Sequence, residues 1–292
     1  MSIAAPPAPT IIGGRLFEWG SRPFVMGIVN VTPDSFSGDG LLGPAADIPA
    51  AVRVAVEQAG RMVAEGADIV DVGGESTRPG HTAVGAEEEA ARVVPVIVAI
   101  HAALPATPIS VDTSKLAVAA AALDAGASLL NDVWGVSADD AMARLAAERK
   151  VPLVLMHNRA EPLYANLMAE LLDDLGAAVE RAVRAGVPER NLILDPGFGF
   201  GKTPEHNLLV LRELPRMRAL GRPILLGTSR KSTIGRVLGG APPEARLEGT
   251  LATTALGIAA GVDIVRVHDV QANVRVARVC DAVLRAHFGG VS

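Results

Sequence analysis

Cysteine, aromatic residues and long apolar runs are all scarce in this 292-residue sequence. The single cysteine, Cys280, cannot form an internal disulfide, and its place in a late helical segment with no base beside it indicates a packing role. No stretch reaches the roughly 20 apolar residues of a membrane span, and the N-terminal MSIAAPPAPT lacks a charged region followed by a long apolar one. We therefore predict a cytoplasmic protein.

A run of Lys or Arg that could follow a phosphate backbone is also missing. The 27 basic and 32 acidic residues are scattered through the chain and leave a net charge of −5. Proteins that bind nucleic acid concentrate positive charge on one face or along one helix. We expect neither nucleic acid nor a membrane among the partners.

The residues that are abundant favour an α/β fold. Hydrophobic residues make up 49% of the chain although aromatics make up only 3%. Ala, Val, Leu, Ile and Gly dominate, a mixture that suits parallel strands buried on both faces under Ala-rich helices. The length exceeds that of most single domains, but α/β barrels typically run to about 250 residues.

Short apolar runs, each followed by a longer Ala-rich segment of helical period, recur along the chain. There are eight: FVMGIVNVT from Phe24, DIVDVGGE from Asp68, PISVDTS from Pro108, SLLNDV from Ser128, VPLVLMH from Val151, NLILDPG from Asn191, PILLGTS from Pro223 and DIVRVHDV from Asp263. A solenoid could produce the same period of roughly 35 residues, but the segments share no repeat signature. Since eight parallel strands close a barrel, we predict one (β/α)8 TIM-barrel domain over residues 23–288 and an N-terminal extension over residues 1–22.

A glycine precedes several of these runs, in EGADIV, DAGASLL, RAGVPER and AAGVDIV. Glycine suits the left-handed residue just past a helix C-terminus. The sequence therefore predicts helix ends at Gly66, Gly126, Gly186 and Gly261.

A polar residue stands where each apolar run stops. These residues are Asn30, Glu75, Asp112, Asn131, His157, Asp195, Ser229 and His268. Any one of them could be an ordinary helix cap or turn residue. The C-terminal ends of barrel strands face a common mouth, so eight together indicate a site for a ligand rich in hydrogen-bonding groups.

The last two strand ends carry positive charge. GTSRKSTIG and RVHDV place Ser229, Arg230, Lys231, Arg266 and His268 around the final two loops, where barrels often bind phosphate. Solvated surface cations are the alternative. Arg266 and His268 alternate within one strand and so share a face, which favours side chains that point inward.

LDPGFGFGKT resembles a phosphate-cradling P-loop but lacks its spacing. The Gly of the Gly-Lys pair is Gly201, and five positions earlier, where a P-loop requires glycine, stands Pro196. We interpret the segment as a conformationally special turn that delivers Asp195 and Phe200.

A heterocycle that presents an N–H and an NH2 side by side is matched by a carboxylate that accepts both hydrogen bonds. Asp112 and Asp195 are candidates for that role, and Asn131 can read a mixed edge. HExxH and CxxC spacings are absent from the sequence. Any metal is therefore expected to be a hard ion such as Mg²⁺, held largely by substrate oxygens.

Taken together, the motifs resemble those of the dihydropteroate synthases, folate-pathway enzymes inhibited by sulfonamides. The matching segments follow the family's order over nearly the whole barrel: MGIVNVTPDSFS from Met26, DVGGESTRPG from Asp71, SVDTSK from Ser110, LLNDV from Leu129, LMHN from Leu155, LDPGFGFGKT from Leu194, GTSRKS from Gly227 and RVHDV from Arg266. The resemblance implies a homodimeric transferase that joins 6-hydroxymethyl-7,8-dihydropterin diphosphate to 4-aminobenzoate and releases diphosphate.

The resemblance also implies a role for each matching residue. The pterin would be bound by Asp112, Asn131, Met156, Asp195 and Lys231. The diphosphate would be bound by Asn30, Arg266 and His268, and Asn30 would be the protein ligand of Mg²⁺. The 4-aminobenzoate would be bound by Thr77, Arg78, Pro79, Phe200 and Ser229. The residues implied in catalysis are Asp39, Lys231, Arg266 and His268.

The first loop departs from the family pattern, because Gly38 precedes Asp39 where the family has Asp before two glycines. This shift puts the family's role for that Asp, steadying a cation, in doubt here. His157 has no assigned role, since a good leaving group and a weakly basic arylamine require no strong general base. Two rivals stay open: a pterin-binding methyltransferase, which needs no diphosphate site, and a non-catalytic pterin-binding protein.

Overall fold

The computed structural model describes residues 6–32, 48–75, 84–135 and 140–285. Within these ranges, eight parallel strands alternate with helices, as the sequence predicts. The strands are β3 (Phe24–Asn30), β4 (Ile69–Gly73), β5 (Ile109–Asp112), β6 (Leu129–Asp132), β7 (Leu153–Met156), β8 (Leu192–Asp195), β9 (Leu225–Leu226) and β10 (Ile264–Val267). The helices are α1 (Ile48–Glu65), α2 (Ala86–Ala103), α3 (Leu116–Asp124), α4 (Ala141–Arg149), α5 (Leu167–Arg184), α6 (Pro204–Glu213), α7 (Ser232–Val237), α8 (Leu247–Ala259) and α9 (Val270–Arg285). No helix in the described part of the chain is both long and apolar enough to cross a membrane.

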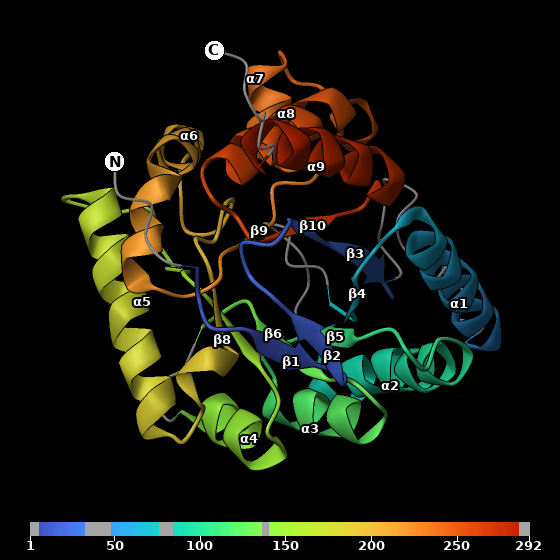
Figure 1. Cartoon of the computed structure of the whole chain (residues 1–292). Coiled ribbons are helices and arrows are strands. Elements are labelled where there is room, and N and C mark those ends of the chain that lie inside the picture. The colour runs from blue at the N-terminus through green and yellow to red at the C-terminus, as the bar shows by residue number, and fades with distance from the viewer. Residues whose placement is uncertain (1–5, 33–47, 76–83, 136–139, 286–292) are drawn as a thin grey trace.

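The sheet closes on itself. Its strand order is β8-β7-β6-β5-β4-β3-β10-β9, and a parallel bridge between Leu194 and Ile224 joins β8 to the segment that enters β9. Figure 1 looks along the barrel and shows the helices arranged around the strands. The expected (β/α)8 barrel is confirmed.

Two apolar clusters follow from the alternation of side chains along the strands. Residues of the outer cluster lie between strands and helices, where Ala51, Ala55 and Ala59 present small side chains from one face of α1. The inner cluster fills the barrel with one or two side chains from most of its strands, among them Met26 and Ile69. The barrel is therefore a packed core whose function depends on its ends.

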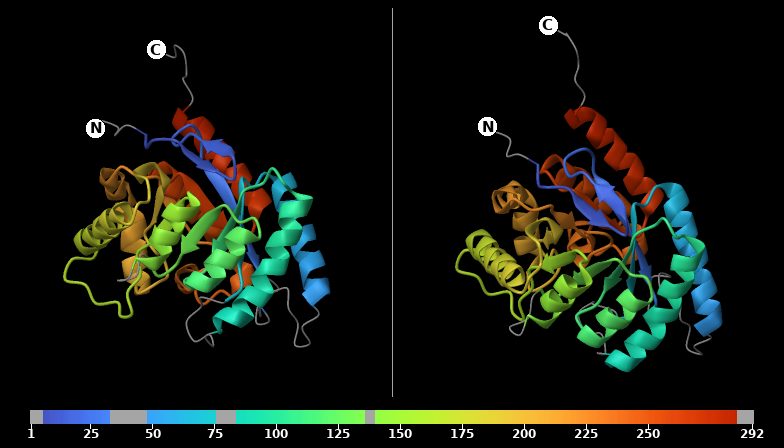
Figure 2. Two further views of the ribbon diagram at one scale, coloured as in Figure 1. Left: turned by 90° about the horizontal axis from the view of Figure 1, so that it is seen from below. Right: turned by 60° about the horizontal axis from the view of Figure 1, so that its bottom comes forward.

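An N-terminal hairpin covers one end of the barrel (Figure 2). It consists of β1 (Thr10–Ile12) and β2 (Arg15–Phe17), paired antiparallel. Phe17 and Trp19 are buried in the inner cluster, with ring centroids 4.8 and 5.4 Å from that of Phe24. Since Phe24 begins β3, the hairpin covers the N-terminal ends of the strands.

Asp68, just before β4, holds this end together. Its buried carboxylate accepts hydrogen bonds from Arg15 at 2.8 Å, from Arg22 at 2.6 and 2.9 Å and from the backbone N–H of Val25 at 3.0 Å. Charge-assisted bonds to a shielded carboxylate are stronger than neutral ones. The candidate site lies at the opposite end of the barrel, where the strands finish.

The four glycines predicted to end helices all have positive φ angles. Gly66, Gly126, Gly186 and Gly261 lie at 107°, 113°, 102° and 94°, just past α1, α3, α5 and α8. A side chain is disfavoured in this region. The local turn chemistry was therefore predicted correctly from sequence.

Candidate active site

The predicted strand-end residues meet at the C-terminal end of the barrel. The backbone register aligns Asn30 of β3 with Gly73 of β4, Gly73 with Asp112 of β5, and Asp112 with Asn131 of β6. Asn131, Asp195 and Ser229 are buried, whereas Asn30 and Asp112 are half-buried. Their convergence follows directly from the parallel topology.

Arg266 of β10 points inward and connects several of these residues. Its Nε donates to Asp71 Oδ2 at 2.6 Å and its Nη2 donates to Asp112 Oδ2 at 2.5 Å. Asn131 Nδ2 donates to the same Asp71 oxygen at 3.3 Å. Burial opposes the charge of Arg266, but the two carboxylates outweigh it and raise the pKa of the guanidinium.

Asp71 was not predicted as a site residue. It lies in the middle of β4 and is fully buried. An ionisable residue inside an apolar strand is costly to bury unless it is paired, so the sequence IVDVG carried a signal. The local sequence could not identify the partner of Asp71, because Arg266 lies 195 positions further along the chain.

Asp195 ends β8 and is fixed by the turn that follows. Its Oδ1 accepts a hydrogen bond from the Gly197 backbone N–H at 2.7 Å. Burial raises the pKa of Asp195 against the opposing charge of Lys231. Burial also disfavours the charged form of Lys231 and lowers its pKa to about 8, and the charge of Asp195 opposes this shift.

Lys231 precedes α7 and reaches the turn after β8. Its Nζ donates to the Phe198 carbonyl and lies 4.3 Å from the centroid of the Phe200 ring. A cation at this distance over an aromatic face is attracted by it. The structure thus brings together Lys231, which the family resemblance assigned to the pterin, and Phe200, which it assigned to 4-aminobenzoate.

Ser229 and His268 also meet. Ser229 Oγ lies 2.9 Å from His268 Nδ1 and accepts a hydrogen bond from the His268 backbone N–H at 3.2 Å. Next to them, Arg230 forms an ion pair with Asp269, with Nη2 2.7 Å from Oδ1. Its guanidinium is therefore engaged by a carboxylate of the protein. These contacts join the seventh and eighth strand ends.

Four predicted residues, Asp39, Thr77, Arg78 and Pro79, lie outside the described residues. Met156 is buried at the end of β7, and His157 follows it, also buried. His157 contacts Lys202, a residue for which the sequence suggested no role of its own.

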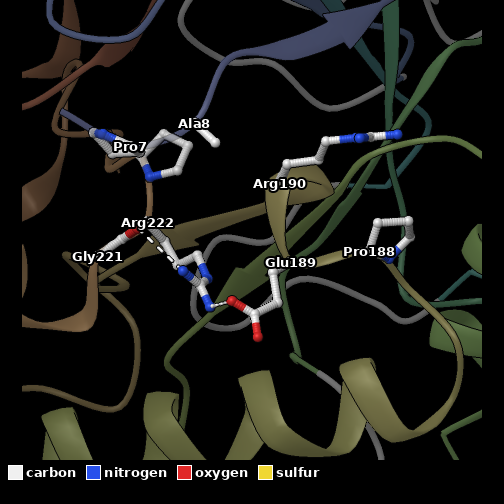
Figure 3. A pocket seen from close by; sticks show the side chains of 8 residues that line it. Pro7, Ala8, Pro188, Glu189, Arg190, Gly221 and Arg222 are labelled. Atoms are coloured by element: carbon white, nitrogen blue, oxygen red, sulfur yellow. Dashed lines mark hydrogen bonds and ion pairs between the residues drawn. The ribbon is translucent and has the colours of Figure 1, made fainter.

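A pocket of about 300 Å³ at the opposite end of the barrel is separate from this site. It lies among residues that precede β8 and β9, including Pro188, Arg190 and Gly221, and residues of the N-terminal extension (Figure 3). Arg222 donates there to Glu189 and to the Gly221 carbonyl. None of the predicted site residues lines it.

Comparison with known proteins supports the geometry. A family model described as "Pterin binding enzyme" matches residues 26–268. The chain belongs to the pterin-binding enzyme family, and within it to the dihydropteroate synthases. A dihydropteroate synthase of Clostridium beijerinckii is 50% identical over 275 residues, which cover 94% of this chain and 99% of the relative.

Solved structures of dihydropteroate synthases share this fold. A Clostridium difficile dihydropteroate synthase crystallised in the presence of pteroic acid has a TM-score of 0.86 and 48% identity, covering 92% of this chain and 100% of that one. A Xanthomonas albilineans dihydropteroate synthase with 4-aminobenzoic acid has a TM-score of 0.88 and 43% identity, covering 97% and 100%. The family predicted from the motifs is confirmed.

Proposed function

We propose that this chain condenses 6-hydroxymethyl-7,8-dihydropterin diphosphate with 4-aminobenzoate to give 7,8-dihydropteroate and diphosphate. One observation carries the proposal: carboxylates, an amide and cations converge where the barrel strands end, with Arg266 bridging Asp71 and Asp112. A mouth of this kind suits a polar heterocycle that carries an anionic group. One solved relative was crystallised in the presence of pteroic acid and another with 4-aminobenzoic acid, and both agree with this choice of substrates.

Pterin recognition is assigned to Asp112, Asn131, Met156, Asp195 and Lys231. Asp112 Oδ1 is buried and has no hydrogen-bond partner in the described part of the chain. A buried acceptor left unpaired costs free energy that a ligand N–H recovers on binding. Asp112 can therefore accept a hydrogen bond from the amidine-like edge of the pterin without giving up its contact with Arg266.

The diphosphate site is assigned to Arg266 and His268, and Ser229 steadies His268. The ring nitrogen Nδ1 of His268 faces Ser229 Oγ at 2.9 Å. This contact fixes the plane of the imidazole at the end of β10, beside Arg266 of the same strand. A histidine in this place binds the leaving group and need not transfer a proton.

Mg²⁺ fits at Asn30. A Cβ placed on Gly73 would lie 3.8 Å from both Asn30 Oδ1 and Asp112 Oδ2, so two oxygens of the kind that Mg²⁺ prefers lie beside the same backbone position. No group of three or more His, Cys, Asp or Glu side chains suited to a metal was found among the described residues. Asn30 would hold an ion whose other ligands are substrate oxygens and water. When bound, Mg²⁺ would neutralise charge on the departing diphosphate.

In the reaction, the bond between the pterin methylene carbon and the diphosphate oxygen breaks, and its electron pair leaves with diphosphate. The amine of 4-aminobenzoate supplies the pair for the new carbon–nitrogen bond and then loses a proton. Arg266 and His268 stabilise the charge that develops on the leaving oxygen. Phe200 and Ser229 are assigned to the amine side of the site.

Diphosphate release tests this proposal. The assay contains the pterin diphosphate, 4-aminobenzoate and Mg²⁺, and compares the parent chain with Asp195→Ala and Lys231→Ala. Arg184→Ala, which removes a cation that is 67% exposed on α5, is the control. We expect turnover by the parent and the control and a loss of about 100-fold or more in kcat/KM in the two site variants. Pterin binding without turnover by the parent would support a non-catalytic protein instead.

A homodimer and a cytoplasmic location complete the proposal. Exposed apolar side chains lie on the late helices, among them Leu256 of α8 and Val279 and Val283 of α9. Helices α8 and α9 pack side by side (Figure 1), so these side chains offer area for a second copy. Light scattering of the parent and of Val283→Glu would test the dimer.

A further inference from the structure

Lys202, the lysine of the Gly-Lys-Thr segment, points toward backbone oxygens. Its Nζ lies 3.1 Å from the Gly197 carbonyl oxygen, 3.0 Å from that of Phe200 and 3.3 Å from that of His157. The first two belong to the turn after β8, and the third belongs to the segment after β7. One ammonium group therefore joins two loops at the mouth of the barrel.

His157 orients this ammonium group. Lys202 Nζ lies 2.9 Å from His157 Nδ1, and His157 Nε2 lies 3.2 Å from Asp174 Oδ2 on α5. Burial lowers the pKa of Lys202 to about 7, and the charge of Asp195 opposes this shift. In its protonated form Lys202 can only donate, so Nδ1 then accepts and Nε2 carries the proton that is donated to Asp174. Burial, reinforced by the charge of Lys202, lowers the pKa of His157 to about 4, so the ring is neutral near pH 7.

The turn itself leaves little freedom. Gly197 has a φ of 66°, and a Cβ there would lie 1.8 Å from the His157 carbonyl oxygen. Three carbonyl oxygens thus converge on one position, and their negative ends would repel one another without a donor between them. The three N–H groups of Lys202 are shared among these carbonyl oxygens and His157 Nδ1.

The same turn carries the site. The Gly197 N–H binds Asp195, the Phe198 carbonyl accepts from Lys231, and the Phe200 ring lies under the Lys231 ammonium. A shift of the turn would move Phe200 most, because Asp195 is also held in β8 by its strand neighbours and Lys231 belongs to another segment, at the start of α7. The amine side of the site therefore depends on the turn more than the pterin side does.

We propose that Lys202, oriented by His157, is a positioning residue that holds the Gly197–Phe200 turn in the shape required to bind 4-aminobenzoate. This inference rests on the proposed function. It gives the Gly-Lys-Thr segment a role that is not phosphate binding, and it gives the buried histidine a role that is not acid–base catalysis.

The test is steady-state diphosphate release with each substrate varied in turn. We compare Lys202→Met with the parent and with Lys150→Met, a matched change at an exposed lysine after α4. Since a displacement of about 1 Å can cost up to 100-fold in rate, we expect the KM for 4-aminobenzoate to rise about tenfold or more. The KM for the pterin diphosphate should change less than about threefold, because the pterin side of the site depends less on the turn. A general loss of binding would instead raise both KM values together.

Two further variants keep the test decisive. Lys202→Arg retains the charge and should show a smaller rise in the same KM. His157→Asn retains an acceptor near Nδ1 and loses the link to Asp174, so it should give a smaller rise even if Lys202→Met does not fold. An equal rise in both KM values, or an unchanged KM for 4-aminobenzoate, would overturn the positioning role. A parent chain that releases no diphosphate would instead overturn the proposed function.

Discussion

Arg266 donates to two carboxylates at once, Asp71 at 2.6 Å and Asp112 at 2.5 Å. Asp71 is fully buried, and its Oδ1 has no hydrogen-bond partner among the described residues. The proposed diphosphate ligand and the proposed pterin ligands therefore share one electrostatic network. A change at any member is expected to affect both stability and substrate binding.

The first prediction tests this network by a double-mutant cycle. Arg266→Met leaves the buried Asp71 without its cation and should lower the free energy of unfolding by about 3–5 kcal/mol. Asp71→Asn removes the charge that needs pairing, so the double variant should be more stable than Arg266→Met alone. Urea denaturation of the four proteins measures the coupling. Strictly additive effects would show that the ion pair is energetically unimportant.

The second prediction compares two glycines with positive φ. Gly197 and Gly14 lie at 66° and 78°, but a Cβ on Gly14 would have no heavy atom within 4 Å, whereas one on Gly197 would clash with the His157 carbonyl. Gly14→Ala should cost only about 1–2 kcal/mol of left-handed strain. Gly197→Ala should cost at least about 2 kcal/mol more, because the turn must move. Equal losses in denaturant unfolding would contradict the close approach.

Most of the fold was predictable because its signals are local. The alternation of apolar runs with helical segments, and glycine at helix ends such as Gly66, depend on short stretches of sequence. The positions of Asp112, Asn131 and Asp195 at the mouth followed from a general property of parallel barrels. The individual roles of these residues stay predictions that the proposed experiments test.

The remaining features depend on contacts between distant segments. Asp71 meets Arg266 only because β3 brings β4 and β10 together in the closed sheet. The local sequence around Lys202 suggested no role for its side chain, and only the fold shows its contact with His157. Residues 10–17 form strands too short to show a period, so their hairpin was not predicted.

The third prediction concerns pH. Burial raises the pKa of Asp132 to about 7, opposed by a hydrogen bond from the Trp134 backbone N–H and reinforced by Asp112. In the unfolded chain an aspartate titrates near pH 3.9, so between about pH 4 and 7 the unfolded state binds fewer protons than the folded state. The free energy of unfolding therefore falls as the pH rises through this window and then levels off.

Asp132→Asn removes this titration and retains the oxygen that accepts from Trp134. We expect the variant to be more stable than the parent at pH 8, by up to roughly 4 kcal/mol, and the difference to vanish near pH 4. Asp173→Asn, at an exposed position of α5, controls for the loss of one negative charge. A stability difference that is independent of pH would contradict the assignment.

The fourth prediction concerns the hairpin that covers the N-terminal end of the barrel. Phe17 is fully buried against Phe24 and Trp19, whereas its neighbour Leu16 is 52% exposed. Phe17→Ala opens a cavity in the inner cluster and should lower the free energy of unfolding by about 3–5 kcal/mol. Leu16→Ala, one residue away on the outer face, should change it by no more than about 0.5 kcal/mol.

Denaturant unfolding distinguishes a hairpin that completes the core from one that only lies against it. In the first case Phe17→Ala lowers the midpoint of the whole cooperative transition, because the inner cluster includes Met26 and Ile69 of the barrel as well as Phe17. In the second case Phe17→Ala and Leu16→Ala would give the same midpoint as the parent. Phe17 is the buried residue of β2, whereas Arg15 and Leu16 are exposed, and this favours the first outcome because only a buried side chain can leave a cavity.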